Sequence, residues 1–263
     1  MRFVRLTIAY DGTEFCGFQF QPNRRTVQTA LEQAILRVTG ETLRVVAAGR
    51  TDAGVHALGQ VISFATTSRY EPRVFRRALS SELPDDIVIL EVADAPDGFD
   101  AIECATGKRY RYLIDDGAAA DVFARSFAWR IWQRLDVAKM HQAAQLLRGT
   151  HDFRSFQNAG SSRVITVRTV KDLSVERRIC GNAERVVIEI EADGFLYNMV
   201  RNIVGTLAQV GKGKESLSWP AEVLATKNRR LAGMCAPPHG LYLVKVDYEG
   251  RELRVEDRDS EKV

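Results

Sequence analysis

The sequence predicts an α+β fold in which two similar halves surround a mostly antiparallel sheet with a central cleft. Two observations favour this class. The first half of the chain has the element order strand, helix, strand, strand, helix, strand, and the second half has a similar order. At about 150 residues per domain, 263 residues suit one large domain or two smaller ones. The similarity of the halves rests on element order, because the residues themselves show no repeat.

In the first half, alternation, helical spacing and turn residues define six elements. Residues 3–10 alternate apolar and polar side chains and end at an Asp-Gly pair, as a strand followed by a turn does. Thr26 is predicted to cap a helix whose apolar residues recur at helical spacing up to Gly40. Pro72 lies in the first turn of a second helix. The remaining elements are two strands, this second helix and a final strand, at residues 43–48, 60–65, 71–83 and 87–92.

Similar signals run through the second half. A strand is predicted at residues 108–115, followed by a short strand at 127–133 and a helix at 136–147. Two strands, a helix and a closing strand follow, at residues 164–175, 185–192, 196–210 and 241–248. The order of the first half, strand, helix, strand, strand, helix, strand, is the split β-α-β pattern of ferredoxin-like and RNA-recognition folds, and the second half is similar apart from the short strand at 127–133. We therefore expect two ferredoxin-like/RRM-like β-α-β-β-α-β halves, with their sheets continuous or side by side.

The chain is expected to divide into three parts. Residues 1–105 form an N-terminal half, residues 106–248 form a C-terminal half, and residues 249–263 form a tail. The tail has ten charged residues of both signs in fifteen, so we expect it to be solvated and mobile.

Composition excludes several classes of protein. Hydrophobic residues make up 45% and charged residues 27%, which suits a folded globular chain and not a disordered one. Apolar runs are far shorter than the roughly 18 residues of a membrane span. The N-terminus alternates like a strand and lacks the apolar core of a signal peptide. We therefore expect neither membrane insertion nor secretion.

The cysteines and histidines give no support for a metal site. The four Cys are far apart, no C-x-x-C pair occurs, and the four His are scattered. We expect reduced thiols, no bound metal and a cytoplasmic location. The net charge of +3 is compatible with a polyanionic partner but does not require one.

One candidate functional segment lies between two predicted strands. Residues 49–57 read Gly-Arg-Thr-Asp-Ala-Gly-Val-His-Ala, and their glycines allow tight backbone geometry. Asp52 can therefore be held rigidly at the end of a strand while it faces a cleft. Because Asp in a loop also commonly forms a turn with its own backbone, this segment alone leaves open whether Asp52 is structural or catalytic.

A second candidate segment interleaves cations and aromatic rings. We expect Lys108, Arg109 and Arg111 on one face of a strand and Tyr110 and Tyr112 on the other. Such interleaving suits RNA, because cations meet phosphates while aromatic faces stack on unpaired bases. The alternative is an edge strand with a half-buried aromatic face.

A third candidate is Arg201, within the predicted helix at 196–210. It flanks the apolar stripe of that helix, one turn from Tyr197, so we expect it to be partly buried. A partly buried Arg needs an acidic partner, whereas a surface Arg extends its head group into water.

These three segments belong to a longer ordered set of motifs. The further blocks are Tyr10-Asp11-Gly12, Gly17-Phe18-Gln19, Asp152-Phe153, Ser155-Phe156, Met199-Val200-Arg201-Asn202 and Gly240-Leu241-Tyr242-Leu243. In this order they resemble the TruA-type tRNA pseudouridine synthases, from about residue 6 to residue 248. Two positions depart from the family pattern. Phe18 stands where the family usually has Trp, which is expected to affect packing, and Ile102 replaces a usual Arg, which is expected to remove a basic contact.

The resemblance implies an isomerase that converts uridine to pseudouridine within tRNA. The N1–C1′ bond is cut, the uracil turns in its pocket, and C5 bonds to C1′. Asp52 is then the essential carboxylate. It acts as a nucleophile at the sugar, as a nucleophile at the base, or as a base that forms a glycal, and the sequence leaves these routes open. No metal or organic cofactor is implied, because no redox change or activated group enters the isomerisation.

The resemblance also assigns substrate-binding roles. Arg201 pairs with Asp52 and fixes its orientation. Tyr110 stacks on the extruded base, and its hydroxyl helps to remove the C5 proton. Arg50 enters the RNA stack in place of the flipped base. Phe195 and Leu241 are apolar walls, although plain core packing is the alternative for both. His56 is expected to support the loop.

The implied partner is tRNA, modified on the 3′ side of the anticodon stem-loop, and the implied assembly is a homodimer that holds one tRNA across both subunits. Phosphate contacts are expected from basic residues spread over the chain. They are Arg24, Arg25, Arg73, Arg76, Arg77, Lys108, Arg109, Arg111, Arg154, Arg163 and Arg168.

Two other functions stay open at this level. A non-catalytic RNA-binding protein or tRNA chaperone on the same fold would keep its effect after Asp52→Asn. A carboxylate-dependent glycosidase or nucleosidase would release free uracil, but the sequence shows no obvious second catalytic carboxylate.

Overall fold

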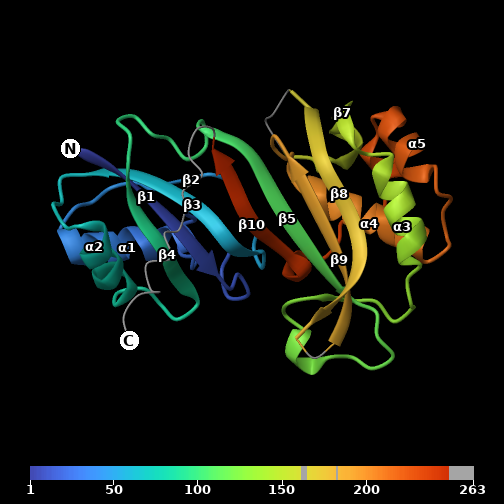
Figure 1. Cartoon of the computed structure of the whole chain (residues 1–263), viewed down its shortest axis with the longest axis horizontal. Helices are drawn as coiled ribbons and strands as arrows, with labels where there is room; N and C mark the ends of the chain where they lie inside the picture. The colour runs from blue at the N-terminus through green and yellow to red at the C-terminus, as the bar shows by residue number, and fades with distance from the viewer. Residues whose placement is uncertain (161–164, 182, 249–263) are drawn as a thin grey trace, which may run out of the picture.

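The computed structural model describes residues 1–160, 165–181 and 183–248 (Figure 1). The predicted tail therefore lies outside the described residues. Within them, ten strands form one sheet: β1 Arg2–Tyr10, β2 Val46–Ala47, β3 His56–Thr66, β4 Ile87–Ala95, β5 Ala105–Asp115, β6 Trp129–Arg130, β7 Gly149–Asp152, β8 Val167–Cys180, β9 Ala183–Ala192 and β10 Leu241–Tyr248. The α-helices are α1 Val27–Thr39, α2 Pro72–Ser80, α3 Val137–Gln145, α4 Met199–Gly211 and α5 Trp219–Thr226.

The sheet repeats one strand order in both halves. Its main path is β4-β1-β3-β10-β5-β9-β8-β7, with β2 paired to β3 and β6 to β5. When the short strands β6 and β7 are left out of the count, each half places its fourth, first, third and second strands side by side, as β4-β1-β3-β2 and β10-β5-β9-β8. The prediction of two halves with the same element order in a mostly antiparallel sheet is confirmed.

Strand β10 joins the halves into one sheet. It pairs antiparallel with β5 along most of its length and parallel with β3 at His56 and Ala57. Strand β10 therefore lies at the seam between the halves (Figure 1), next to the start of β3, which directly follows the loop that carries Asp52. Of the two sheet arrangements left open by the sequence, the continuous one is correct.

The helices begin and end where cap residues allow. The Thr26 side chain accepts a hydrogen bond from the Thr29 backbone, and Gly40 ends α1 with a φ of 75°. Pro72 is the first residue of α2. Helix α4 begins three residues later than predicted, because Asn198 has a φ of 60° and cannot continue a right-handed helix.

Short elements are where sequence and structure differ. The strand expected at 43–48 is only Val46–Ala47, and the one at 127–133 is only Trp129–Arg130. Strand β7 and helix α5 were not predicted. Strand β7 is four residues long and shows no apolar alternation, and α5 is eight residues long with Pro220 in its first turn. Such short segments form because they pack on longer neighbours.

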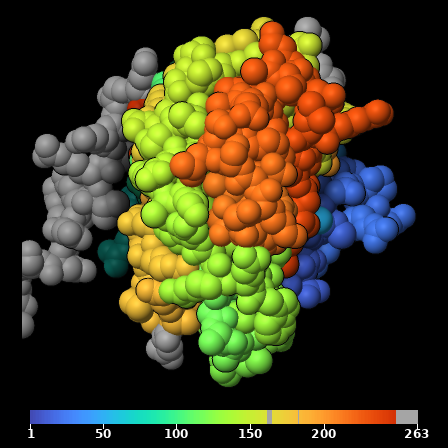
Figure 2. All heavy atoms as spheres, turned by 90° about the vertical axis from the view of Figure 1, so that its right-hand side faces the viewer, coloured from blue at the N-terminus to red at the C-terminus, as the bar shows by residue number. Residues whose placement is uncertain are grey.

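The main core lies between the sheet and its helices. Side chains at alternate strand positions, such as Leu6, Ile62 and Tyr112, are fully buried, and α4 is buried on nearly all sides. Figure 2 shows α3 and α5 covering the end of the molecule nearest the viewer. In the described part of the chain, no helix has the length and apolar character needed to span a membrane.

Candidate active site

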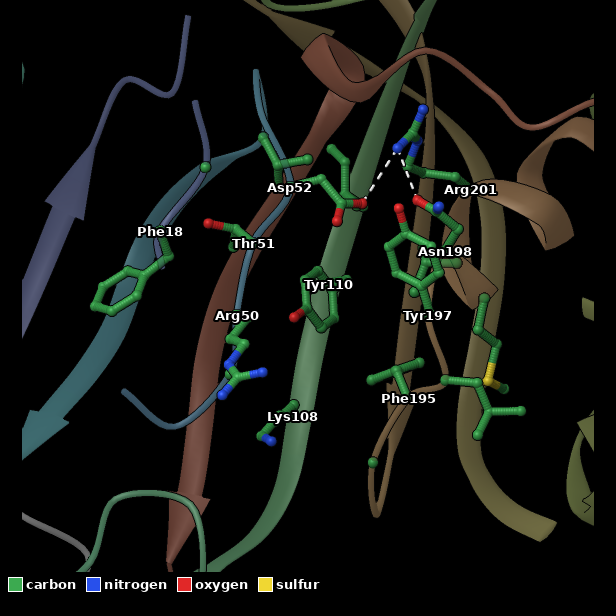
Figure 3. A pocket seen from close by; sticks show the side chains of 18 of the residues that line it. Phe18, Arg50, Thr51, Asp52, Lys108, Tyr110, Phe195, Tyr197, Asn198 and Arg201 are labelled. Atoms are coloured by element: carbon green, nitrogen blue, oxygen red, sulfur yellow. Dashed lines mark hydrogen bonds and ion pairs between the residues drawn. The ribbon is translucent and has the colours of Figure 1, made fainter. Parts of the chain in front are cut away.

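A pocket of about 1060 Å³ lies where the two halves meet. Residues of the N-terminal half line it from two loops, 16–21 and 48–55, and residues of the C-terminal half line it from β5 and the segment 193–201. Of the residues expected to act on substrate, the structure brings six together here: Arg50, Asp52, Tyr110, Phe195, Arg201 and Leu241. Figure 3 shows five of them around the centre of the pocket.

Asp52 and Arg201 form an ion pair across the seam. Arg201 lies in the first turn of α4, and its Nη1 is 3.2 Å from Oδ2 of Asp52 (Figure 3). The side chain of Arg201 is 15% exposed and that of Asp52 is 33% exposed, so the carboxylate is open to the pocket while its partner is sheltered. The expectation of a partly buried Arg with an acidic partner is confirmed.

Polar contacts hold the Asp52 loop from behind. Thr51 and the buried Tyr10 share a hydrogen bond of 2.7 Å between their hydroxyl oxygens. The amide of Gln60 donates to the backbone carbonyl of Gly49 at 2.7 Å. Because these groups lie on β1 and β3, the carboxylate is held by strands and not by the loop alone.

Glycines let a neighbouring loop lie against this segment. A Cβ on Gly12 would lie 2.0 Å from the backbone oxygen of Val55, and one on Gly17 would lie 2.9 Å from that of Thr51. Gly17 also has a φ of 90°, which side chains rarely permit. These two glycines belong to the ordered sequence blocks, and the close backbone approach is the physical reason for them.

Tyr110 is the central aromatic residue of the pocket. Its ring meets Phe195 edge to face, with centroids 5.0 Å apart. Burial raises the pKa of Tyr110 above its ordinary value of 10.0, and nearby Tyr10 and Asp52 act in the same direction. The phenol therefore stays protonated at neutral pH and is suited to stacking and hydrogen bonding, not to service as an unaided base.

Basic side chains surround the pocket. Arg50, Lys108 and Arg168 line it together with Arg201. The prediction that the three cations of residues 108–112 share one face is wrong, because Lys108 lies on the pocket side with Tyr110 (Figure 3). A strand has a period of two, so positions 108 and 110 must share a face.

Arg109 and Arg111 point to the opposite face of the sheet. Nη2 of Arg109 lies 2.7 Å from Glu191, and its Nη1 lies 3.1 Å from Glu189. Nη2 of Arg111 lies 2.7 Å from the same Glu189. These guanidinium groups neutralise carboxylates of strand β9, and the structure does not bring them to the pocket.

The remaining cations expected to contact tRNA also lie outside the pocket lining. Arg25 pairs with Asp86 at 2.7 Å and lies over the ring of Phe15. Arg76 donates to the backbone oxygen of Leu90 on β4. The others that the structure describes are on exposed surface: Arg24, Arg73, Arg77 and Arg154. Arg163 lies outside the described residues.

His56 connects three backbone segments beside the pocket. Its Nε2 lies 3.0 Å from the carbonyl oxygen of Ser126 and 3.2 Å from that of His239. Carbonyls only accept, so Nε2 carries the proton and Nδ1 accepts from the Gly12 backbone at 3.1 Å. Burial lowers the pKa of His56, despite Asp11 nearby. A neutral, fully bonded ring fits the supporting role expected from the sequence.

The two departures from the family pattern both line the pocket. Phe18 is buried, so its exchange concerns packing under the Asp52 loop. Ile102 is exposed at the rim, where a longer basic side chain would add a cation to the lining.

Sequence reasoning missed two site residues. Tyr10 was seen only as part of a motif, although its hydroxyl supports Thr51. Asn198 was not singled out, although its Oδ1 accepts from Arg201 Nη1 at 2.7 Å. The predicted helix at 196–210 places Asn198 inside the helix, whereas the structure starts α4 at Met199, so the sequence showed no sign of its contact with Arg201. Among the described residues, no group of three or more His, Cys, Asp or Glu is placed to hold a metal ion.

Fold and site together define a protein with an arginine-paired carboxylate in a basic, aromatic pocket at the seam of two α+β halves. Comparison with known proteins makes this specific. Residues 6–102 and 143–249 match the family model described as tRNA pseudouridine synthase, and the chain belongs to that family.

Curated relatives match along nearly the whole chain. A protein named tRNA pseudouridine synthase A from Thermoanaerobacter sp. (strain X514) is 46% identical over 94% of this chain and 100% of its own length. One of the same name from Acetivibrio thermocellus is also 46% identical, again over 94% and 100%. The namesake from Halalkalibacterium halodurans is 45% identical over 92% of this chain and 90% of its own.

Proposed function

We propose that this chain isomerises uridine to pseudouridine in the anticodon stem-loop of tRNA, with Asp52 as the essential carboxylate. The observation that carries the proposal is the Asp52–Arg201 pair at 3.2 Å, inside a pocket lined by Tyr110 and by further cations. Family membership and the names of full-length relatives support the reaction class and the tRNA substrate.

We propose that the pocket residues have distinct roles in the reaction. Arg201 fixes the orientation of Asp52 while one carboxylate oxygen faces the side of Tyr110 (Figure 3). A uracil stacked on Tyr110 would lie within reach of that oxygen. Phe195 and Leu241 exclude water, which matters because the freed uracil must be recaptured and not lost.

The target uridine has to leave the RNA stack to reach this carboxylate. Arg50 is exposed at the pocket and is proposed to take the vacated place in the stack. Lys108 and Arg168 line the same pocket and are proposed to contact flanking phosphates. Such contacts position the RNA without reading its sequence.

The assembly and the location are proposed on family grounds. A homodimer holding one tRNA across both subunits is the expected working form, and the cytoplasm is its expected place.

Tritium release tests the reaction directly. Transcripts made with 5-tritiated uridine lose tritium to water only when C5 exchanges its hydrogen for the bond to C1′. We expect release by the parent protein, and a rate lower by at least about 1,000-fold for Asp52→Asn. Both proteins should bind the tRNA.

Asp193 offers a matched control, because it is the second aspartate of the pocket lining and its Oδ1 accepts from the Thr169 backbone. Asp193→Asn should release tritium at near the parent rate. A parent that binds tRNA without releasing tritium would be an RNA-binding protein instead. Release of free uracil by the parent, abolished equally by Asp52→Asn and by Asp193→Asn, would indicate a glycosidase that uses both carboxylates.

A further inference from the structure

Arg201 is held mainly by groups other than Asp52. Its Nη1 donates to Oδ1 of Asn198 at 2.7 Å, and its Nε donates to the backbone oxygen of Ala236 at 2.7 Å. The contact with Asp52 is longer, at 3.2 Å. The two shorter bonds set where the guanidinium lies, and Asp52 meets a group that is already in place.

One of these acceptors is fixed by a close backbone contact. A Cβ on Gly205 of α4 would lie 1.7 Å from the oxygen of Met234, so the segment before Ala236 is pressed against the helix. The Ala236 backbone N–H also donates to the carbonyl of Arg201 at 3.1 Å. The position of Nε of Arg201 is thus fixed by a backbone oxygen. The position of Nη1 depends on the side chain that accepts its hydrogen bond.

That side chain is Asn198, and its conformation is unusual. It precedes α4 with a φ of 60° and a ψ of 13°, in the left-handed region that Asn tolerates better than most residues. An Asn at this position normally caps the helix with its side chain, but Asn198 makes no such bond. Its Oδ1 is turned to Arg201 instead (Figure 3).

We propose that Asn198 is a positioning residue for the reaction: it fixes the Arg201 guanidinium so that Asp52 is oriented before substrate arrives and Arg201 stays in place as Asp52 reacts. The proposal rests on the proposed function. It gives the pocket a chain of three side chains, Asp52–Arg201–Asn198, in which Asn198 acts on Asp52 through Arg201.

The test is Asn198→Gly. Glycine accepts a φ of 60° without strain and is tolerated before a helix, and no capping bond is lost, so the fold should keep its melting temperature. Released from Asn198, the guanidinium can rotate, and we expect kcat for tritium release to fall roughly 10- to 100-fold with KM for tRNA unchanged. Asn198→Asp keeps an oxygen that can accept from Arg201 but adds a negative charge that competes with Asp52. Its kcat should therefore lie between those of the parent and of Asn198→Gly.

Asn23→Gly is the matched control, since Asn23 has a φ of 58° and does not line the pocket. It should leave kcat and KM at parent values. The proposal fails if Asn198→Gly keeps the parent kcat, if it raises KM with kcat intact, or if the aspartate variant is no faster than the glycine variant. A parent protein that releases no tritium would instead overturn the proposed function. The failure of the Asn198 proposal and the failure of the proposed function can therefore be told apart.

Discussion

The two faces of strand β5 carry the same kinds of residue and use them differently. On one face, Lys108 and Tyr110 line the pocket. On the other, Arg109 and Arg111 are held by Glu189 and its neighbours on β9, directly across the ladder. A cation next to carboxylates in register stabilises the sheet, whereas Lys108 is part of the pocket lining, where the proposed substrate anion would bind. Position on the strand, and not residue type, separates the two roles.

The largest effect should follow from removing a cation on the opposite face. Arg109→Ala deprives Glu189 and Glu191 of a shared partner, and we expect the free energy of unfolding to fall by about 2 kcal/mol. Urea denaturation measures this change. Affinity for tRNA should stay at the parent value, and a clear loss of affinity would instead restore Arg109 as an RNA contact.

A smaller effect, on tRNA binding and not on stability, should follow from removing the cation on the pocket face. Lys108→Ala is expected to weaken tRNA binding roughly fivefold, or about 1 kcal/mol, and to lower the salt dependence of binding by about one counterion. Filter binding across a series of salt concentrations measures both quantities. An unchanged salt slope, with Arg109→Ala run in parallel, would show that the two faces do not differ as proposed.

The smallest effect concerns His56, a polar residue beside the pocket whose contacts are structural. Burial lowers the pKa of His56 below its ordinary 6.5, so the unfolded chain takes up the proton first as the pH falls. The stability contributed by neutral His56 is therefore present above pH 6.5 and is lost below it.

Between pH 7.5 and 5.5 the free energy of unfolding should decrease more in the parent than in His56→Gln. The two decreases should differ by less than about 1 kcal/mol. Denaturation at the two pH values measures this difference. Burial, and the nearby His56, also lower the pKa of His239, which remains in both proteins, so the effect of its burial cancels from the comparison. Equal decreases in parent and variant would mean that the pKa of His56 is the same in the folded and unfolded states.

Much of the fold could be predicted because its signals are local. Alternation predicted β1 and β9, and Thr26 with Gly40 predicted both ends of α1. The period of two already requires Lys108 to share a face with Tyr110. The short β7 and α5 could not be predicted, because their stability comes from the elements they pack against.

The candidate site divides along the same line. The motif around Asp52, and each of the ordered blocks that carry the family resemblance, is a short run of consecutive residues, so the sequence by itself determines them. The meeting of Asp52 with Arg201 joins residues 149 apart in the chain, and the anchoring of Arg201 by Asn198 and Ala236 depends on how α4 and the segment before β10 pack. Only the tertiary structure decides those contacts, because distances between remote segments follow from packing and not from local pattern.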